Sequence, residues 1–444
     1  MSKIIDAVSI ILTWEDEIFL IERQHYLKAF PGYISFPGGK VEPDDAKYSV
    51  INPYNIEESI LGAAIREGEE ELGNNLGELL RLGEVTRIDH LGVAITPDFN
   101  PYRFATHFLR FRLSNKPAMT IDTNEARTSF WLKASVIKER FEAGEFLAVP
   151  PIRKTCIDLG ENIDLTTIEN LNVVYDSETQ VPFIEPMQGL VQIMPLSHTL
   201  RPATRTNAFL VGDINKVLID PSPIDEAEYV KLKNTVLKFG INEIFITHHH
   251  PDHYEYSNLL ARELNLPVSL SNDTFQRIEK KLPGYFEGVE LFIRKEGDVI
   301  THWLGQAVRV YEVPGHDEGQ LALAPDNMNW FLAGDLFQGI GTVVIGDEEG
   351  DMKKYMETLK RVISLNPKVI FPSHGIGLGG THYLQKTLEH RQMREAEILK
   401  LHQANFNEDQ ILQQIYADVH PALHPYARKN IQKHLQKLKD EGRI

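Results

Sequence analysis

The chain has 444 residues, of which 42% are hydrophobic and 25% are charged, as in ordinary folded proteins. This composition excludes a long disordered chain or a coiled coil, and no apolar run approaches the ~18 residues of a membrane span. The net charge of −17 disfavours a general polyanion-binding surface, because such surfaces neutralise phosphates with cations. One cysteine, Cys156, excludes an internal disulfide. We therefore expect a cytoplasmic protein with no secretion signal and no membrane partner.

The sequence pattern changes twice along the chain and so defines three zones. Three domains are also what a chain of this length predicts at ~150 residues per domain. We predict domains at 1–178, 179–380 and 381–444. In the first zone, apolar alternation and helical spacing predict two paired strands, a helix ended by Gly73, and two later strands. These elements are, in chain order, Ala7–Leu12, Ile18–Ile21, Glu57–Leu72, Phe108–Leu113 and Ser129–Leu132.

In the second zone, short apolar strands are followed by clusters of Gly, Pro, His and Asp. The predicted strands are Ala208–Val211, Val217–Ile219, Ile244–Ile246, Val308–Val310 and Val369–Phe371. Buried strands that end in polar residues are typical of α/β enzymes, which place their chemistry at strand ends. The third zone is helical in period.

A carboxylate cluster lies on the helix of the first zone. Glu67, Glu70 and Glu71 are spaced i, i+3 and i+4, so they share one helical face and repel one another. A hard divalent cation such as Mg²⁺ would remove this conflict, since it prefers carboxylate oxygens together with substrate phosphates. A solvated acidic face is the alternative interpretation. The glycine turn Phe36–Lys40 ahead of the helix, with Arg66 beside the cluster, favours the metal site.

These residues resemble the Nudix box, which is a glycine, then a glutamate, then Arg-Glu-x-x-Glu-Glu-x-Gly. Arg66 to Gly73 matches the last part, and Glu58 stands where the first glutamate belongs. Gly39 lies 19 residues before Glu58 instead of six, which predicts a 13-residue insertion at about Asp44–Ile56.

The entry segment from Leu20 to Lys40 is similar to the coenzyme A diphosphatase branch of the Nudix hydrolases. The resemblance implies hydrolysis of a nucleoside diphosphate-linked small molecule, either a nucleotide or a coenzyme A-like compound. It implies that Mg²⁺ or Mn²⁺ is held by Glu67, Glu70 and Glu71. The catalytic residues would be Arg66, Glu70 and Glu71, and Glu58 and Gly39 would support the site. Glu125 is a candidate base, and a non-catalytic nucleotide-sensing module is the alternative.

A histidine-rich cluster follows the strand Ile244–Ile246. It contains His248, His250, Asp252 and His253, and neutral imidazole is the commonest transition-metal ligand. A surface histidine cluster is the alternative. Three later strands also end in possible ligands, which favours a metal site built from strand ends; these ligands are His316, Asp335 and His374.

This order of residues resembles the metallo-β-lactamase superfamily. The resemblance implies two zinc ions, one held by His248, His250 and His316, and the other by Asp252, His253 and His374, with Asp335 bridging them. It also makes Asp252 a catalytic residue and gives Asp220 an orienting role behind the ligands. Such a pair of ions lowers the pKa of a shared water toward neutrality.

Two segments are similar to the β-lactamase-like protein 2 family, namely Thr206–Gly212 and Gly334–Thr342. That family is linked to endoribonuclease activity on single-stranded RNA, while some of its relatives act on thioesters. The resemblance therefore implies a hydrolase of RNA phosphodiesters. An acyl-CoA or other thioesterase is the alternative.

The tail predicts two helices, Asp409–Tyr416 and Ala427–Leu438, and is similar to the winged-helix-like cap of the same family. Four cations on the second helix are candidates for RNA binding, namely Arg428, Lys429, Lys433 and Lys437. The alternative is a cap that packs on the metal domain or supports a homodimer. Together the resemblances imply a multidomain α/β and α+β chain: a Nudix α/β/α sandwich, a metallo-β-lactamase αββα sandwich and a small winged-helix-like helical cap.

Overall fold

The computed structural model describes residues 3–48, 54, 56–73, 76–346 and 348–444. Contacts divide the chain into two compact units. Unit 1 contains Met1–Tyr175 and Ile184–Gln188, and unit 2 contains Asp176–Phe183 and Gly189–Ile444. Much of the predicted insertion, at 49–53 and 55, lies outside the described residues. The boundary at 178/179 stays a prediction.

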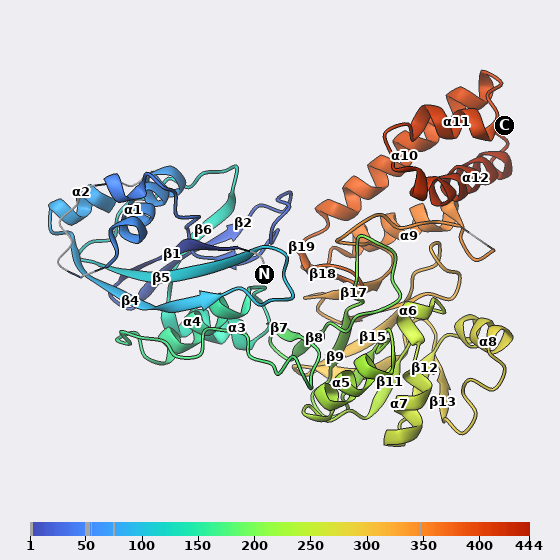
Figure 1. The fold of residues 1–444 in the computed structure, drawn as a ribbon, viewed down its shortest axis with the longest axis horizontal. Coiled ribbons are helices and arrows are strands. Elements are labelled where there is room, and N and C mark those ends of the chain that lie inside the picture. The colour runs from blue at the N-terminus through green and yellow to red at the C-terminus, as the bar shows by residue number, and fades with distance from the viewer. Residues whose placement is uncertain (1–2, 49–53, 55, 74–75, 347) are drawn as a thin grey trace. The chain divides into compact units, whose positions relative to one another are not determined.

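Unit 1 is built around one mixed sheet with helices on both faces (Figure 1). Its strands are ordered β3-β2-β1-β5-β4, and β6 pairs with β2. The strands are β1 Ile4–Trp14, β2 Glu17–Arg23, β3 Ile34–Ser35, β4 Val85–Ile95, β5 Arg103–Leu113 and β6 Ala126–Lys133. The helices are η1 Asp45–Lys47, α1 Glu58–Leu72, α2 Leu76–Arg81, α3 Ala134–Glu142 and α4 Pro150–Glu161.

The alternation of side chains along β1 explains the layers of unit 1. Ile10 and Leu12 pack with α1, whereas Ile11 packs on the opposite face with α3 and α4. Since successive residues of a strand point to opposite faces, an uninterrupted apolar run can serve two cores. Gly73 ends α1 in the left-handed conformation, as predicted. The predicted sandwich of helix, sheet and helix layers is confirmed.

Unit 2 begins with two sheets, each covered by helices on its outer face (Figure 1). The first follows the order β13-β12-β11-β10-β9-β8 and the second β14-β15-β16-β17-β18-β19. The rings of Phe209 on β9 and Phe371 on β18 meet at 5.6 Å, so the sheets share a packed interior. The predicted αββα sandwich is confirmed.

The elements of this sandwich are short, and nearly all its strands are buried. The strands are β8 Leu190–Ile193, β9 Ala208–Val211, β10 Val217–Ile219, β11 Glu243–Phe245, β12 Val268–Leu270, β13 Leu291–Ile293, β14 Val299–Trp303, β15 Gln306–Glu312, β16 Leu321–Pro325, β17 Phe331–Gly334, β18 Val369–Pro372 and β19 Leu378–Gly379. The helices are α5 Glu226–Leu237, α6 Pro251–Tyr254, α7 Ser257–Leu264, α8 Asn272–Lys281 and α9 Met352–Leu365. β7 (Phe183–Met187) lies where the chain passes between the units.

The tail of unit 2 is helical throughout residues 382–444, all of which the structure describes, and contains no strand. Its elements are α10 His382–Gln403, α11 Glu408–Ile415, η2 Pro421–Leu423 and α12 His424–Asp440. Three helices share a small core that includes Ile398, Ile411 and Ile431. The predicted helical cap is confirmed. Among the described residues, no helix is long and apolar enough to cross a membrane.

Candidate metal centres

The carboxylate site of unit 1 is built where α1 approaches the glycine turn. A Cβ on Gly39 would lie 2.1 Å from Oε1 of Glu67, so this close approach requires glycine. The N–H of Gly38 donates to Glu71 Oε2 at 3.1 Å. The turn and the helix face that carry the predicted Nudix box therefore meet. Glu58 begins α1 and is exposed, about 13 Å along the axis from Glu67.

Arg66 joins the acidic groups of this site. It donates to Glu67 at 2.8 Å and to Glu70 at 3.1 Å, and it also bonds both carboxylate oxygens of Asp45 at 2.8 and 3.1 Å. Hydrogen bonding to Asp45 raises the pKa of Arg66. Asp45 is buried and belongs to η1, inside the predicted insertion, so that segment contributes directly to the site.

Burial opposes negative charge on two of the three glutamates. It raises the pKa of Glu67, and it raises the pKa of Glu71 to about 8, with the neighbouring charges of Glu125 and Glu67 adding to the effect. Glu125 therefore lies close enough to act on both side chains, as a candidate base must. Glu70 is more open, with 59% of its side chain exposed. A divalent cation would favour the charged forms of these carboxylates.

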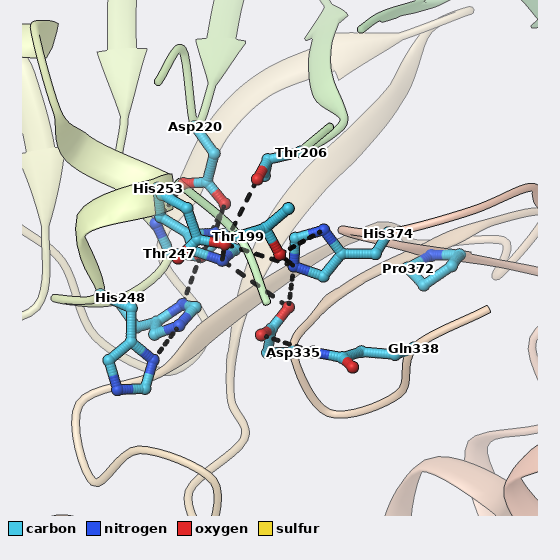
Figure 2. A network of polar contacts seen from close by, with 12 residues as sticks. Thr199, Thr206, Asp220, Thr247, His248, His253, Asp335, Gln338, Pro372 and His374 are labelled. Atoms are coloured by element: carbon cyan, nitrogen blue, oxygen red, sulfur yellow. Dashed lines mark hydrogen bonds and ion pairs between the residues drawn. The ribbon is translucent and has the colours of Figure 1, made fainter. Parts of the chain in front are cut away.

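In unit 2 the predicted ligands come from the ends of four strands and gather in one place, and Figure 2 shows four of them, namely His248, His253, Asp335 and His374. β11 leads into His248 and His250, and α6 then carries Asp252 and His253 in its first turn. The other ligands follow β15, β17 and β18 in that order, namely His316, Asp335 and His374. Parallel β17 and β18 bring the last two ligands to the same edge of their sheet.

The ligand atoms form two adjoining sets. In the first set, Nδ1 of His250 lies 2.9 Å from Nε2 of His248 and 3.0 Å from Nε2 of His316. In the second set, Nε2 of His374 lies 3.5 Å from Oδ2 of Asp252, and Nε2 of His253 lies 3.8 Å from the same oxygen.

Asp335 reaches both sets. Its Oδ1 is 3.7 Å from His253 and 3.4 Å from His374, whereas its Oδ2 is 3.7 Å from His316. These distances agree with the predicted bridging position.

Each ligand histidine has a partner for the nitrogen that faces away from the set. Nδ1 of His253 is 2.8 Å from Asp220, and Nδ1 of His316 is 2.9 Å from the carbonyl of Val344. The remaining pairs are His248 with Thr247 Oγ1 at 3.0 Å, His374 with the Arg205 carbonyl at 3.0 Å, and His250 with Glu349 at 3.5 Å. A carbonyl accepts only from a protonated nitrogen, so in the neutral imidazoles Val344 and Arg205 place the proton on Nδ1 and leave Nε2 of His316 and His374 unprotonated, as a metal ligand must be.

Asp220 holds an unusual backbone conformation with φ of 50° at the end of β10. Its carboxylate accepts from the N–H of Thr247 at 2.8 Å and from the hydroxyl of the same residue at 2.7 Å. It therefore contacts the start of the histidine segment as well as His253.

Burial and mutual repulsion act strongly on the protonation of this cluster. Burial lowers the pKa of His316 to about 4 and keeps the pKa of His248 well below its usual range. Burial also opposes a proton on His253, but the carboxylates of Asp252, Asp220 and Asp335 outweigh it and raise the pKa of His253 to about 10. Without a metal, a proton on His253 therefore balances the neighbouring carboxylates, and a bound cation would supply that positive charge instead.

The residues fit a metal centre. Nε2 of His253 and Oδ1 of Asp335 are buried and make no hydrogen bond with any described residue, although both point into the cluster. Buried polar atoms without partners are costly, and a bound cation would satisfy both. Within the part of the chain that the structure describes, four groups of three side chains place ligand atoms within 4.8 Å, and all four lie in unit 2.

His249 points to a different partner. It forms an ion pair with Asp317, and Asp317 is completely buried. Several outer contacts escaped the sequence analysis, namely those of Arg205, Thr247, Gln338, Val344 and Glu349. Gln338 had a signal, since it follows Asp335 by three residues in the segment Gly334–Thr342 and donates to it at 3.1 Å. The carbonyls of Arg205 and Val344 had none, because any residue can supply one.

The four cations predicted to bind RNA are engaged to different degrees. Arg428 pairs with Asp409, and Lys437 pairs with Glu395 and Glu441. Lys429 packs over Gly346, where an added Cβ would meet its Cδ at 2.7 Å. Lys433 makes no ion pair with a described residue. At least two of the four charges, those of Arg428 and Lys437, are therefore already neutralised within the tail.

The fold and the ligand sets define the class of each unit. Unit 1 carries a NUDIX domain, matched over residues 3–149, and unit 2 carries a domain of the metallo-beta-lactamase superfamily, matched over residues 201–374. Residues 408–444 match a beta-lactamase associated winged helix domain. The chain thus joins two metal-dependent hydrolase domains.

Among known proteins, unit 2 is similar to the beta-lactamase-like protein 2 homolog of Drosophila melanogaster, with 27% identity over 58% of this chain and 89% of that protein. It is also similar to a hydroxyacylglutathione hydrolase of Wigglesworthia glossinidia brevipalpis, with 30% identity over 36% of this chain and 56% of that protein. A beta-lactamase domain protein from Burkholderia ambifaria shares the fold, with a TM-score of 0.51 and 17% identity over 61% of this chain and 90% of that one.

Proposed function

We propose that unit 2 is a dizinc hydrolase of single-stranded RNA phosphodiesters. The observation that carries this proposal is the pair of adjoining ligand sets, with Asp335 reaching both at 3.4–3.7 Å. When bound, two such ions lower the pKa of a shared water and offset negative charge on the attacked phosphate.

The residues of the chain prepare this site in two ways. His248 and His253 are fully buried, so the ligand atoms are held in a dry cluster where electrostatic interactions are strong. Outer partners such as Asp220 fix which nitrogen of each imidazole faces inward. Asp252 is part of the second set and accepts from Thr206 at 3.4 Å, which limits its rotation.

A groove beside the site favours a nucleic-acid substrate. Its lining residues include Phe337 and Gln338 from the loop after β17, and Tyr383 and Lys386 from α10, around a cavity of about 200 Å³. Gln338 also donates to Asp335, so the groove begins next to the ligands. The groove offers the cation of Lys386 for a phosphate contact, whereas the ring of Phe337 is buried in the hydrophobic core and packs with that of Tyr383 at 6.2 Å.

The second candidate is a thioesterase. It is favoured by the similarity to the hydroxyacylglutathione hydrolase, at 30% identity. That match covers 56% of the relative, whereas the match to the beta-lactamase-like protein 2 homolog covers 89% of its length. The longer match is to the family whose resemblance implies an RNA substrate, so we place RNA first.

For unit 1 we propose hydrolysis of a nucleoside diphosphate-linked small molecule with Mg²⁺ or Mn²⁺. Glu67, Glu70 and Glu71 would hold the cation, and Arg66 would keep the first two in place. The proposal is supported by the approach of Gly38 and Gly39 to these carboxylates.

Purified full-length protein with its zinc content measured should be given labelled single-stranded RNA and, separately, an acyl-CoA. We expect RNA cleavage that His250→Ala abolishes and that His302→Ala, an exposed histidine on β14, retains. Thioester cleavage alone would overturn the RNA proposal and support the second candidate.

A further inference from the structure

The loop of residues 335–346, which follows β17, touches the first ligand set at both of its ends. Asp335 begins this loop and lies 3.7 Å from His316. Near the other end, the carbonyl of Val344 lies 2.9 Å from Nδ1 of the same histidine. The position of His316 therefore depends on the conformation of a loop that contains no regular secondary structure.

Two residues of the helical tail hold the backbone on either side of Val344. Arg391 of α10 donates to the carbonyl of Val343 at 2.6 Å. Asn430 of α12 accepts from the N–H of Ile345 at 3.0 Å. Both side chains are buried, with 2% and 6% exposure, so these hydrogen bonds are shielded from water.

The tail is itself fixed in place around these two residues. The guanidinium of Arg391 lies over the ring of Tyr355 at 5.6 Å, and the Tyr355 hydroxyl donates to the carbonyl of Leu336 in the same loop. Glu395 of α10 joins α12 through Lys437 at 2.8 Å. The two contacts on the loop are thus made from α10 and α12, which are themselves joined by an ion pair.

We infer that Arg391 and Asn430 are positioning residues for the first metal. By holding Val343 and Ile345, they fix the carbonyl of Val344, which keeps the proton of His316 on Nδ1 and presents bare Nε2 to the ion. The helical tail then serves the metal centre, whatever substrate the enzyme takes. Partners behind a ligand histidine typically change metal affinity by about 10–100-fold.

This inference rests on the proposed metal centre, and the experiment separates the two. Zinc affinities of the full-length protein would be measured by competition with a chromophoric chelator. Asn430→Leu keeps the size of the side chain but removes the acceptor, so we expect one of the two zinc ions to bind about 10–100-fold more weakly. Asn430→Asp keeps an acceptor oxygen and should restore the affinity.

Gln432→Leu is the matched control, because it replaces an amide side chain on the same helix but removes only a hydrogen bond to Glu408 of α11, away from the loop. It should leave both zinc affinities unchanged. Equal loss of affinity in this control, or unchanged affinity in Asn430→Leu, would overturn the positioning role alone. A wild-type protein that binds no zinc would overturn the proposed metal centre as well.

Discussion

The two candidate metal sites of this chain hold their ligands in different ways. In unit 2 the imidazoles of His248 and His316 contact that of His250 directly, at 2.9 and 3.0 Å, and each has an outer partner. In unit 1 an arginine side chain, Arg66, stands among the carboxylates and bonds Glu67 and Glu70. The ligands of unit 2 thus contact one another, whereas the carboxylates of unit 1 are joined by the side chain of Arg66.

The difference follows from charge. Neutral imidazoles can be packed together in a dry interior, so strand ends can preorganise them before a metal binds. Carboxylates that share a helix face repel one another, so they need a cation or a bound proton to relieve the repulsion. We therefore expect the site in unit 2 to hold its ions before a substrate binds. We expect the site in unit 1 to take up its ion together with the substrate, as Mg²⁺ commonly does.

The largest expected effect is on the preorganised site. His250→Ala removes a ligand that contacts two others, and metal catalysis is worth several kcal/mol, so hydrolysis by unit 2 should fall at least about 10³-fold. Hydrolysis by unit 1, assayed with a nucleoside diphosphate-linked substrate, should be unchanged. Zinc content and the two rates would be measured on the same preparation. A parallel loss of both activities would contradict independent sites.

Glu70→Gln should reduce the Mg²⁺-dependent activity of unit 1 by about 10²-fold while leaving the zinc content at the wild-type level. The substitution keeps the shape of the side chain but removes a charge that Arg66 and the cation share. The rate would be followed as the Mg²⁺ concentration is raised, with Glu69→Gln, which neutralises the adjacent glutamate outside the cluster, as the control. A wild type without any such activity would identify unit 1 as a nucleotide-sensing module.

Buried carboxylates make the metal-free protein sensitive to pH. The pKa of Glu71 is raised to about 8, so the folded state binds its proton more tightly than the unfolded chain does. In chelated protein, the free energy of unfolding should therefore fall as pH rises from about 4.5 to about 8, by a few kcal/mol at most.

Melting temperatures of the metal-free protein across this range would test the idea. Glu71→Gln should flatten the dependence for unit 1, since the amide carries no charge at any pH. Mg²⁺ should reduce it in the wild type by replacing the proton. If the melting temperature of Glu71→Gln depends on pH as that of the wild type does, other groups cause the dependence and Glu71 does not.

Asp220→Asn probes how rigidly the second ligand set is held. The carboxylate accepts from Thr247 and lies 2.8 Å from Nδ1 of His253. An amide can present its NH₂ to that nitrogen and so favour the wrong tautomer, which should weaken one zinc ion by about 10–100-fold. The effect would be measured by chelator competition, with Asp213→Asn on the same unit as the control. Unchanged affinity would mean that the strand end alone orients His253.

The sequence predicted the histidine site better than its surroundings. Each ligand follows an apolar strand, and strand ends converge by topology, so the ligands could be found from pattern alone. Asp45 could not be found, because its partnership with Arg66 depends on how an insertion folds back. Val344 could not be found either, because it acts through a carbonyl. The cations of α12 matched a helical face, but the acids that neutralise Arg428 and Lys437 come from other helices.

The smallest expected effect concerns where RNA would meet unit 2. Lys386 lines the groove beside Asp335 and its partner Gln338 and pairs with Glu389 at 3.0 Å, whereas Lys433 lies on α12. Lys433→Ala should weaken binding of single-stranded RNA only about twofold, within the range of one exposed charge interaction. Lys386→Ala should weaken it more and lower the salt dependence by about one phosphate contact. Binding would be measured at several salt concentrations with each variant, and a larger effect at Lys433 would place the RNA surface on α12 instead of the groove. Such a result would mean that RNA binds mainly at α12, and that the groove next to the metal ligands is not the main binding surface.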